Sequence, residues 1–377
     1  MSTIKSVYLQ HLNGTTPNAT MDTNGNFTVG GTVSGASSNM FRNRIINGDM
    51  RIDQRNAGAA VTTSGTFPVD RFADQITYGS LSLQQSSTAP AGFKTSVAVT
   101  VTTGGSIISS DRNALSQWIE GYNIADLGFG SATASSITLS FWVRSSLTGT
   151  FSGCVSNNVI DRSYVFTYSI NLANTWEYKT ITISGDTTGT WNNTNGQGLR
   201  VAFDLGTGTT RQSTAGSWQS GDYRAATGAV QLSNTTGATF YITGVQLEVG
   251  TKATPFEVRS YGHELALCQR YYEEFCFNSG SSAGTHYICP GGSFNANQGE
   301  GLLRFSVVKR AAATMSYTGT VDVRTSSVTK TGVTPLFDLA TTYSVNIYTS
   351  TSGLTTNQYV FIMATNSSTK INASAEL

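Results

Sequence analysis

The sequence predicts an all-β protein: an antiparallel jelly-roll β-sandwich, then a short linker helix and a smaller C-terminal β-sandwich, with an extended strand segment at the N-terminus. Only 12% of the 377 residues are charged and 39 are glycines. With abundant Ser, Thr and Asn, this composition is typical of strands joined by tight turns. Apolar and polar residues alternate along most of the chain, whereas a helical period persists only near residue 265.

Residues 1–40 are predicted to form a separate N-terminal segment. The sequence DTNGN at 22–26 lies between two short strand-like pieces, 19–21 and 27–29, and Asn-Gly favours a hairpin turn. So few apolar residues cannot form a core within one copy. The segment is therefore either a flexible tail or, as we favour, a strand-adding segment that attaches to partner chains.

Residues 41–250 are predicted to form the jelly-roll domain. The sequence ITLSFWVR at 137–144 places its alternate apolar residues on one face, as a half-buried strand requires. Gly-rich turns separate such strands, and no fixed-period repeat indicates a solenoid. The predicted strands are 50–53, 72–77, 81–85, 95–101, 137–144, 164–170, 176–183, 199–205 and 239–247.

Residues 251–275 are predicted to be a linker with a short helix. From about residue 260, five residues recur at spacings of four and three, which is the pattern of a coiled-coil seam. Three copies would bring this seam to a common axis; the alternative is that it packs on its own sandwich. The residues of this predicted trimer-axis helix are Tyr261, Leu265, Cys268, Tyr272 and Phe275.

Residues 276–377 are predicted to form the smaller C-terminal β domain. Its predicted strands lie within the run LLRFSVVKR and at 320–323, 344–348, 359–364 and 370–375. About 100 residues are enough for a small sandwich.

Several segments resemble bacteriophage tail-fibre or virion-associated adhesion proteins of marine and related phages. They are FRNRIINGDMRIDQR at 41–55, FPVDRF at 67–72, SQWIEGYN at 116–123 and ITLSFWVRSSLTGTFS at 137–152, and most specifically 239–273. The resemblance covers residues 41–275. It implies a carbohydrate-binding-module-like jelly roll on a phage appendage, usually trimeric, joined to the virion through its N-terminus. The resemblance does not identify individual sugar-binding residues in this sequence.

Catalytic and metal-binding motifs are not predicted. The histidines are His11, His263 and His286; His263 and Cys268 do not share a helical face, so we expect no metal site and no cofactor. The four cysteines form no CxxC pair and are predicted to be reduced. Glycoside hydrolysis needs two neighbouring carboxylates, and the sequence pairs none of the possible donors: Asp70, Asp74, Asp111, Glu120, Asp126, Asp161, Asp204 and Asp222. We expect Asp70 and Arg71 to form a structural ion pair or a turn contact, Glu120 to accept buried hydrogen bonds, and the protein not to be an enzyme.

Sugar binding is predicted instead, because sugar C–H faces stack on aromatic rings while the hydroxyl groups need polar partners. The candidate residues are Trp118, Trp191, Trp218 and Tyr223. The alternative for each tryptophan is that it caps the edge of the sandwich.

These observations predict a structural virion protein, a tail fibre or fibre-like appendage that contacts host surface glycans as a receptor-binding protein. The expected partners are two further copies of the chain (a homotrimer) and tail or portal-proximal virion proteins bound through residues 1–40. Assembly is expected in the host cytoplasm. Lys plus Arg (23) balance Asp plus Glu (22), so neither nucleic acid nor a membrane is an expected partner. The alternatives are a polysaccharide depolymerase of the tailspike type and a head or neck decoration protein without receptor binding.

Overall fold

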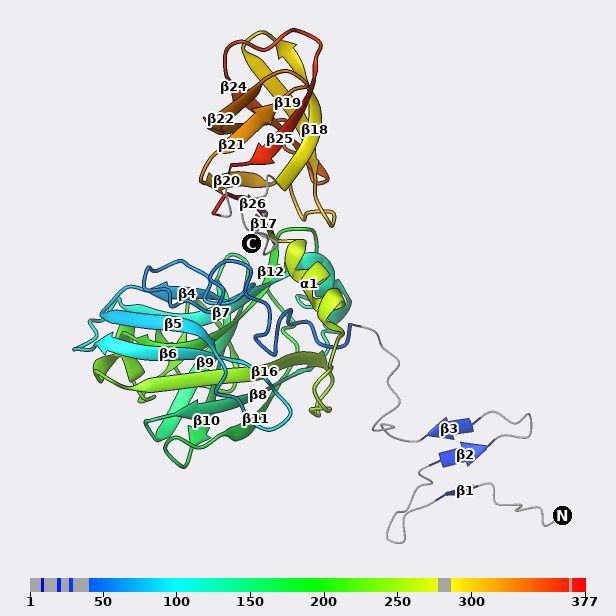
Figure 1. Cartoon of the computed structure of the whole chain (residues 1–377). Helices are drawn as coiled ribbons and strands as arrows, with labels where there is room; N and C mark the ends of the chain where they lie inside the picture. The colour runs from blue at the N-terminus through cyan, green and yellow to red at the C-terminus, as the bar shows by residue number, and fades with distance from the viewer. Residues whose placement is uncertain (1–7, 10–18, 22–26, 30–40, 277–285, 366–367) are drawn as a thin grey trace, which may run out of the picture. The chain divides into compact units, whose positions relative to one another are not determined.

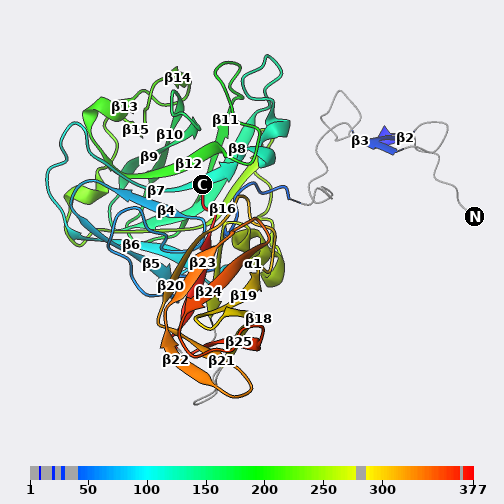
Figure 2. The ribbon, with the colours of Figure 1, turned by 90° about the horizontal axis from the view of Figure 1, so that it is seen from above.

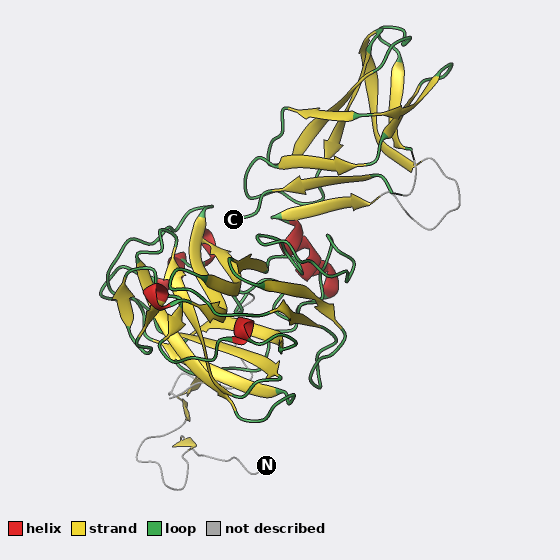
Figure 3. Cartoon of the chain, turned by 90° about the vertical axis from the view of Figure 1, so that its left-hand side faces the viewer, coloured by secondary structure: helices red, strands yellow, loops and turns green. Residues whose placement is uncertain are grey.

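The computed structural model describes residues 8–9, 19–21, 27–29, 41–276, 286–365 and 368–377. The chain divides into two units, Met1–Arg42 and Asn43–Leu377. Strands dominate the described residues (Figure 3). Only one α-helix occurs among the described residues, and the other helical segments are 3₁₀ turns. The predicted all-β antiparallel class is confirmed, whereas the domain boundaries predicted at residues 250 and 275 stay predictions.

The first unit contains a three-stranded antiparallel sheet. It consists of β1 (Tyr8–Leu9), β2 (Ala19–Met21) and β3 (Phe27–Val29), in the order β1-β2-β3. Ala19 pairs with Val29 and Met21 with Phe27, so the two predicted strands form the expected antiparallel pair. The Asn-Gly turn predicted between them lies outside the described residues.

Two large antiparallel sheets form the sandwich of the second unit (Figure 1). The six-stranded sheet has the order β14 (Trp218–Ser220), β10 (Arg162–Ile170), β9 (Gly149–Asn157), β12 (Gln197–Thr207), β7 (Arg112–Glu120), β4 (Ala73–Ile76). The five-stranded sheet has the order β11 (Glu177–Ile183), β8 (Ile137–Ser145), β16 (Thr239–Val249), β6 (Ser96–Thr103), β5 (Ser80–Ser86). The neighbouring strands β5 and β6 can be followed in Figure 2. A short parallel pair, β13 (Gln212–Ser213) with β15 (Ala225–Ala226), and four 3₁₀ turns complete this part.

The core of the sandwich comes from the inward faces of both sheets. Leu139 and Phe141 of β8 are fully buried, and Phe141 meets Phe203 of the opposite sheet at 5.0 Å between ring centroids. This edge-to-face contact links the two layers. The alternation read from the sequence therefore placed the core side of β8 correctly.

The predicted strand at 50–53 is wrong. Asn47 and Met50 have positive φ angles of 60° and 59°, and the Asn47 side chain holds this loop together. Its Nδ2 donates to the backbone oxygens of Ile52 and Asp70, while its Oδ1 accepts from the Ile52 amide. These side-chain hydrogen bonds hold the segment as a loop, so its backbone does not pair as a strand.

Strand β9 was not predicted, because it is rich in small and polar residues. It lies inside the six-stranded sheet and is covered on both faces. A Cβ at Gly153 would lie 2.4 Å from the Ala202 oxygen and from the Phe166 ring. Close packing therefore requires glycine at a strand position that propensity disfavours.

Helix α1 (Tyr261–Gln269) is shorter than the sequence predicts. Its N-cap Ser260 accepts a hydrogen bond from the His263 amide, as predicted for a helix start near 260. The predicted continuation to Phe275 is wrong: Tyr272 and Phe275 lie on strand β17 (Tyr272–Cys276), which pairs with the last strand of the chain. That pairing satisfies the backbone groups in place of further helical turns.

The predicted trimer seam lies largely within its own chain. Cys268 is fully buried against Ile46 and Ile52, and Leu265 packs on the same cluster. Tyr272 is covered by the guanidinium of Arg55 at 3.5 Å. Tyr261 alone of the five residues is strongly exposed (59%). The structure thus matches the alternative in which the stripe packs on its own sandwich, and the trimer stays a prediction.

A buried ion-pair network surrounds the end of α1. The Glu120 carboxylate accepts from Arg270 at 2.6 and 2.9 Å and from the Tyr271 hydroxyl at 2.6 Å. Glu120 is therefore the buried acceptor that the sequence predicted. The predicted Asp70–Arg71 ion pair is wrong, because Asp70 pairs with Arg55 and Arg71 pairs with Glu376. The alternative, a turn contact, is present: Asp70 and Arg71 form the turn between Val69 and Phe72. Asp70 and Arg71 are consecutive, and each bonds a residue from a distant part of the chain.

Two further antiparallel sheets follow α1. The smaller has the order β17, β26 (Lys370–Ser374), β20 (Thr314–Thr318). The larger has the order β22 (Thr329–Val333), β21 (Val321–Arg324), β25 (Tyr359–Ala364), β18 (His286–Asn295), β19 (Gln298–Arg304), β24 (Ser344–Ser350), β23 (Pro335–Asp338). Ile371 of the small sheet shares a core with Ile347 and Ile362 of the large one. This confirms the predicted smaller sandwich.

Candidate functional site

The strongest candidate site lies on the outer face of the seven-stranded sheet. Along β25, Val360 and Ile362 are fully buried in the core, so their neighbours Tyr359 and Phe361 face outward. On β21 the buried Val321 and Val323 leave Arg324 on that same outer face, since Arg324 is the direct partner of Phe361. Two strands distant in sequence thus place a cation beside an aromatic ring.

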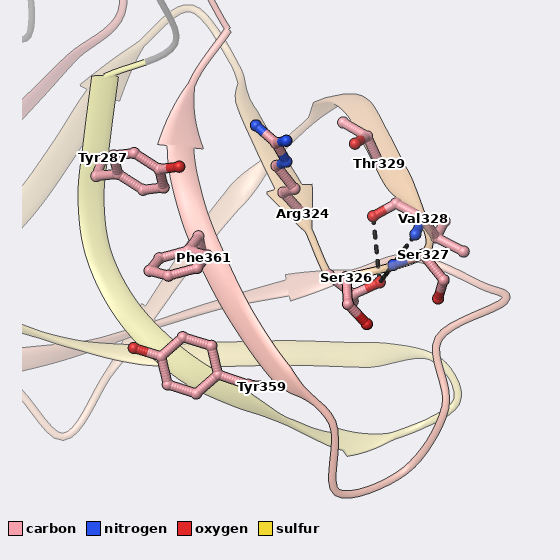
Figure 4. Close-up of a pocket in the computed structure, with 9 residues that line it drawn as sticks. Tyr287, Arg324, Ser326, Ser327, Val328, Thr329, Tyr359 and Phe361 are labelled. Carbon is pink, nitrogen blue, oxygen red and sulfur yellow. Dashed lines mark hydrogen bonds between the residues drawn. The ribbon is translucent and has the colours of Figure 1, made fainter.

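Three aromatic side chains form what we name the aromatic shelf: Tyr287, Phe361 and Tyr359 (Figure 4). The Phe361 centroid lies 4.7 Å from that of Tyr287 and 4.8 Å from that of Tyr359, both in edge-to-face contact. Tyr287 and Tyr359 remain 55% and 61% exposed. The central ring is held by its neighbours, while the two outer rings present aromatic surface to solvent.

The shelf opens into a pocket of about 480 Å³. Arg324 and the β21–β22 turn, residues 325–329, line it together with the three aromatic rings (Figure 4). The turn is held by Thr325, whose Oγ1 accepts from the amides of Ser327 and Val328 at 3.2 and 2.9 Å. Exposed hydroxyl groups of Ser326, Ser327 and Thr329 therefore form a fixed polar rim.

A second pocket of about 550 Å³ continues from Tyr359 along β18. Tyr359 lines both pockets, and the second adds Phe294, Glu300 and Gln358. Phe294 is 65% exposed. Because Tyr359 lines both, the two pockets adjoin at this side chain, and we name them together the groove.

This groove combines flat apolar ring faces with hydroxyl, amide, guanidinium and carboxylate groups. Such a combination suits a ligand that has both a C–H face and many hydroxyl groups. Strands at 320–323 and 359–364 were predicted from the sequence, whereas this site was not. The alternation of Tyr359 and Phe361 with core residues was the available signal, whereas the approach of Tyr287 and Arg324 depends on strand order.

Two of the predicted binding residues, Trp191 and Trp218, lie together at one end of the large sandwich. Their centroids are 5.4 Å apart, and both contact Phe129. Both are partly buried against the sandwich core. Their indole N–H groups donate to backbone oxygens, Trp191 to Thr188 and Trp218 to Ser184. These contacts are those expected where tryptophans cap the sandwich, and the role of the two residues in sugar binding stays a prediction.

The other two, Trp118 and Tyr223, lie on the outer face of the six-stranded sheet. Trp118 is on β7, a strand that the sequence analysis missed, and its ring lies 5.4 Å from the Arg200 guanidinium. Tyr223 packs against the small residues around Cys154 and Ala202. Among the described residues, no ring contact joins either side chain to the Trp191–Trp218 pair.

The carboxylates considered for hydrolysis have structural partners. Asp204 accepts from Thr207, Ser152 and the Gly206 amide. Asp222 pairs with Arg224 and Arg211, and Asp126 pairs with Arg44. Burial raises the pKa of Asp204 to about 6, and burial, opposed by Arg55, raises the pKa of Asp70 to about 6. These two groups carry a desolvation cost when ionised.

Stability is expected to depend on pH through Asp204. An unfolded Asp titrates near 3.9, so between about pH 4 and pH 6 the folded state binds more protons, and its stability falls as pH rises through that window. The Asp204→Asn variant removes this term. Its free energy of unfolding, relative to wild type, should increase by on the order of 2–3 kcal/mol from pH 4 to pH 7. Urea denaturation at both pH values measures this, and a difference independent of pH would contradict it.

No group of three or more His, Cys, Asp or Glu side chains that could hold a metal ion occurs among the described residues. Cys154, Cys268 and Cys289 are free and buried. In the part of the chain that the structure describes, no helix is both long and apolar enough to span a membrane.

Comparison with known proteins gives only weak structural likenesses. No family model matches the chain, and no curated protein matches it. The chain is similar over 55% of its length to the enzymatically active domain of tailspike protein 4 of bacteriophage CBA120, with 13% identity, a TM-score of 0.31 and 22% of that chain covered. It is similar to a CBM4 structure (14% identity, TM-score 0.30, 54% of this chain and 98% of that chain) and to TmCBM61 in complex with β-1,4-galactotriose (9%, 0.28, 55% and 99%). TM-scores this low do not establish a shared fold.

Proposed function

We propose that this chain is a carbohydrate-binding structural protein and that the aromatic shelf contacts the glycan. The observation that carries the proposal is the exposure of Tyr287 and Tyr359 on either side of Phe361, in a groove with a fixed polar rim. A contiguous exposed apolar surface rimmed by polar residues is typical of a binding site.

The groove supplies what sugar recognition needs. The tyrosine rings offer apolar surface for the C–H face of a sugar, and their hydroxyl groups stay in water. The rim of Ser326, Ser327 and Thr329 offers donors and acceptors to ring hydroxyls. Because Tyr359 borders both pockets, an oligosaccharide that occupies both should bind more tightly than a single sugar ring.

The proposed setting is a phage virion, where the chain serves as a tail fibre or fibre-like appendage and binds host surface glycans as receptors. The sequence resemblance over residues 41–275 supports this setting. Residues 1–40 attach the chain to tail or portal-proximal proteins, and three copies assemble in the host cytoplasm. A monomer in analytical ultracentrifugation, or localisation of the chain to the head or neck by electron microscopy, contradicts the respective part of the proposal.

Binding without hydrolysis is the proposed activity. Among the described residues that line the two pockets, Glu300 alone carries a carboxylate, whereas glycoside hydrolysis generally uses two. Release of reducing ends from a bound polysaccharide by the purified chain would favour the depolymerase alternative.

A glycan array tests the proposal. The full chain is expected to bind a defined subset of glycans, and the double variant Tyr287→Ala/Tyr359→Ala is expected to lose that binding while keeping the wild-type circular dichroism spectrum and unfolding midpoint. A flat array for the wild-type chain overturns glycan binding. Equal binding by both proteins overturns the role of the shelf.

A further inference from the structure

Arg324 brings a positive charge to the first pocket. Its side chain is exposed, and no ion pair or hydrogen bond of its guanidinium occurs among the described residues (Figure 4). Asp322, two residues before Arg324 on β21, is buried, and its Oδ1 accepts from Thr365 Oγ1 at 2.7 Å and from the Gly332 amide at 3.0 Å. The donors of Arg324 therefore remain available to a ligand.

The charge of the groove changes across Tyr359. Arg324 is the charged residue among the described residues that line the first pocket, and Glu300 is the charged residue among those that line the second. The first pocket thus presents positive charge beside aromatic rings and hydroxyl groups. A neutral sugar has no group that requires this charge.

We propose that the first pocket binds a sugar ring carrying a negatively charged substituent, a carboxylate or a sulfate ester, with Arg324 as its charge partner. The inference rests on the proposed glycan binding and names the class of glycan. The planar guanidinium donates two parallel hydrogen bonds to an oxyanion, and such charge-assisted bonds are stronger than those between neutral groups. The aromatic shelf positions the sugar ring, and Arg324 favours a ring that carries a negatively charged substituent.

The test uses the full chain and three oligosaccharides of equal length: a galactan, an oligogalacturonate and a sulfated galactan. Isothermal titration calorimetry is expected to give at least about a 10-fold higher affinity for one or both charged ligands than for the neutral one. The uronate and sulfate arms show which anion the pocket prefers. The preference should decrease as the salt concentration rises, because salt screens the exposed pair.

Two variants separate the role of Arg324 from a general effect of charge. Arg324→Gln should bring the charged ligands to within about twofold of the neutral ligand and leave neutral binding unchanged. Arg304→Gln is the matched control, since Arg304 is also exposed, lies on β19 of the same sheet and lines neither pocket. It should keep the full preference.

The outcomes distinguish this inference from the proposed function. Equal affinity for neutral and charged ligands, or a preference that Arg324→Gln does not reduce, overturns the anionic class and leaves glycan binding standing. Binding of none of the three ligands, together with a flat array, overturns both.

Discussion

The Tyr359→Ala variant is expected to lose glycan affinity by about 30-fold or more, the largest loss for any single change on the shelf. Tyr359 lines both pockets and is the ring that joins them. Removing it deletes stacking surface on both sides and leaves Phe361 without one of its two edge-to-face neighbours. Aromatic residues at the centre of an interface commonly contribute about 2 kcal/mol or more. Titration of wild type and variant with the best ligand from the array measures the loss.

Tyr343→Ala is the matched control for this prediction. Tyr343 is 63% exposed, lies next to β24 of the same sheet and lines neither pocket. Its removal should change affinity by less than about twofold, the scale of a neutral surface change. Equal losses in the two variants would show that the tyrosines act through general surface properties, and no loss in Tyr359→Ala would remove the shelf from the account.

Glu120→Ala is expected to reduce the free energy of unfolding by about 3 kcal/mol, the largest effect on stability. Glu120 is buried, and its two oxygens accept all three bonds from Arg270 and Tyr271. The substitution leaves the fully buried Tyr271 hydroxyl without its acceptor. Because Arg270 and Tyr271 connect α1 to β17, the loss should also loosen the junction between the large sandwich and the sheets that follow. Urea denaturation measures the free energy.

Asp126→Ala provides the control for a surface ion pair. The Asp126 side chain is 54% exposed in its pair with Arg44, so its removal should cost less than about 1 kcal/mol. If Glu120→Ala costs no more than Asp126→Ala, the Glu120 network does not stabilise the junction. The same experiment also reports whether one unfolding transition separates into two.

The strands were predictable from the sequence where one face meets the core and the other meets solvent. Strand β24 satisfies this condition, and so does the first half of β25. Strand β8 was predicted from its alternating sequence, although Thr138 and Ser140 on its other face are also buried. Prediction from the alternation of apolar and polar residues failed for β9, which is covered on both faces. It also failed for β7, where buried polar residues interrupt the alternation. Gln117 of β7 exchanges two hydrogen bonds with the backbone of Ile46. No local pattern reveals a partner 71 residues away.

After the end of α1, the apolar residues keep a helical spacing in the sequence although the chain forms a strand. Tyr272 and Phe275 continue the helical spacing of Leu265 and Cys268, yet they lie on a strand. The backbone pairing of Tyr272 with Ser374 and of Phe275 with Ile371 decides the structure there. The C-terminal strand that supplies this pairing lies about 100 residues further along the chain, so local sequence could not reveal it.

The position of the proposed site could not be predicted from the sequence. Exposed aromatic residues with polar neighbours are the chemistry that sugar binding requires, and tryptophans in polar loops were the most visible examples. The rings of Trp191 and Trp218 contact each other, and their indole N–H groups donate to backbone oxygens of the same domain. Tyr287 and Arg324 meet only because β18 and β21 flank β25 in the sheet. That strand order is a property of the tertiary fold.

A crystal structure of the full chain with its best array ligand tests the central claim most directly. We predict a sugar ring against Tyr287 and Tyr359, with a charged substituent at Arg324 and further rings toward Phe294. A ligand bound instead at Trp118, Trp191 or Trp218, with the shelf left to solvent, would contradict it.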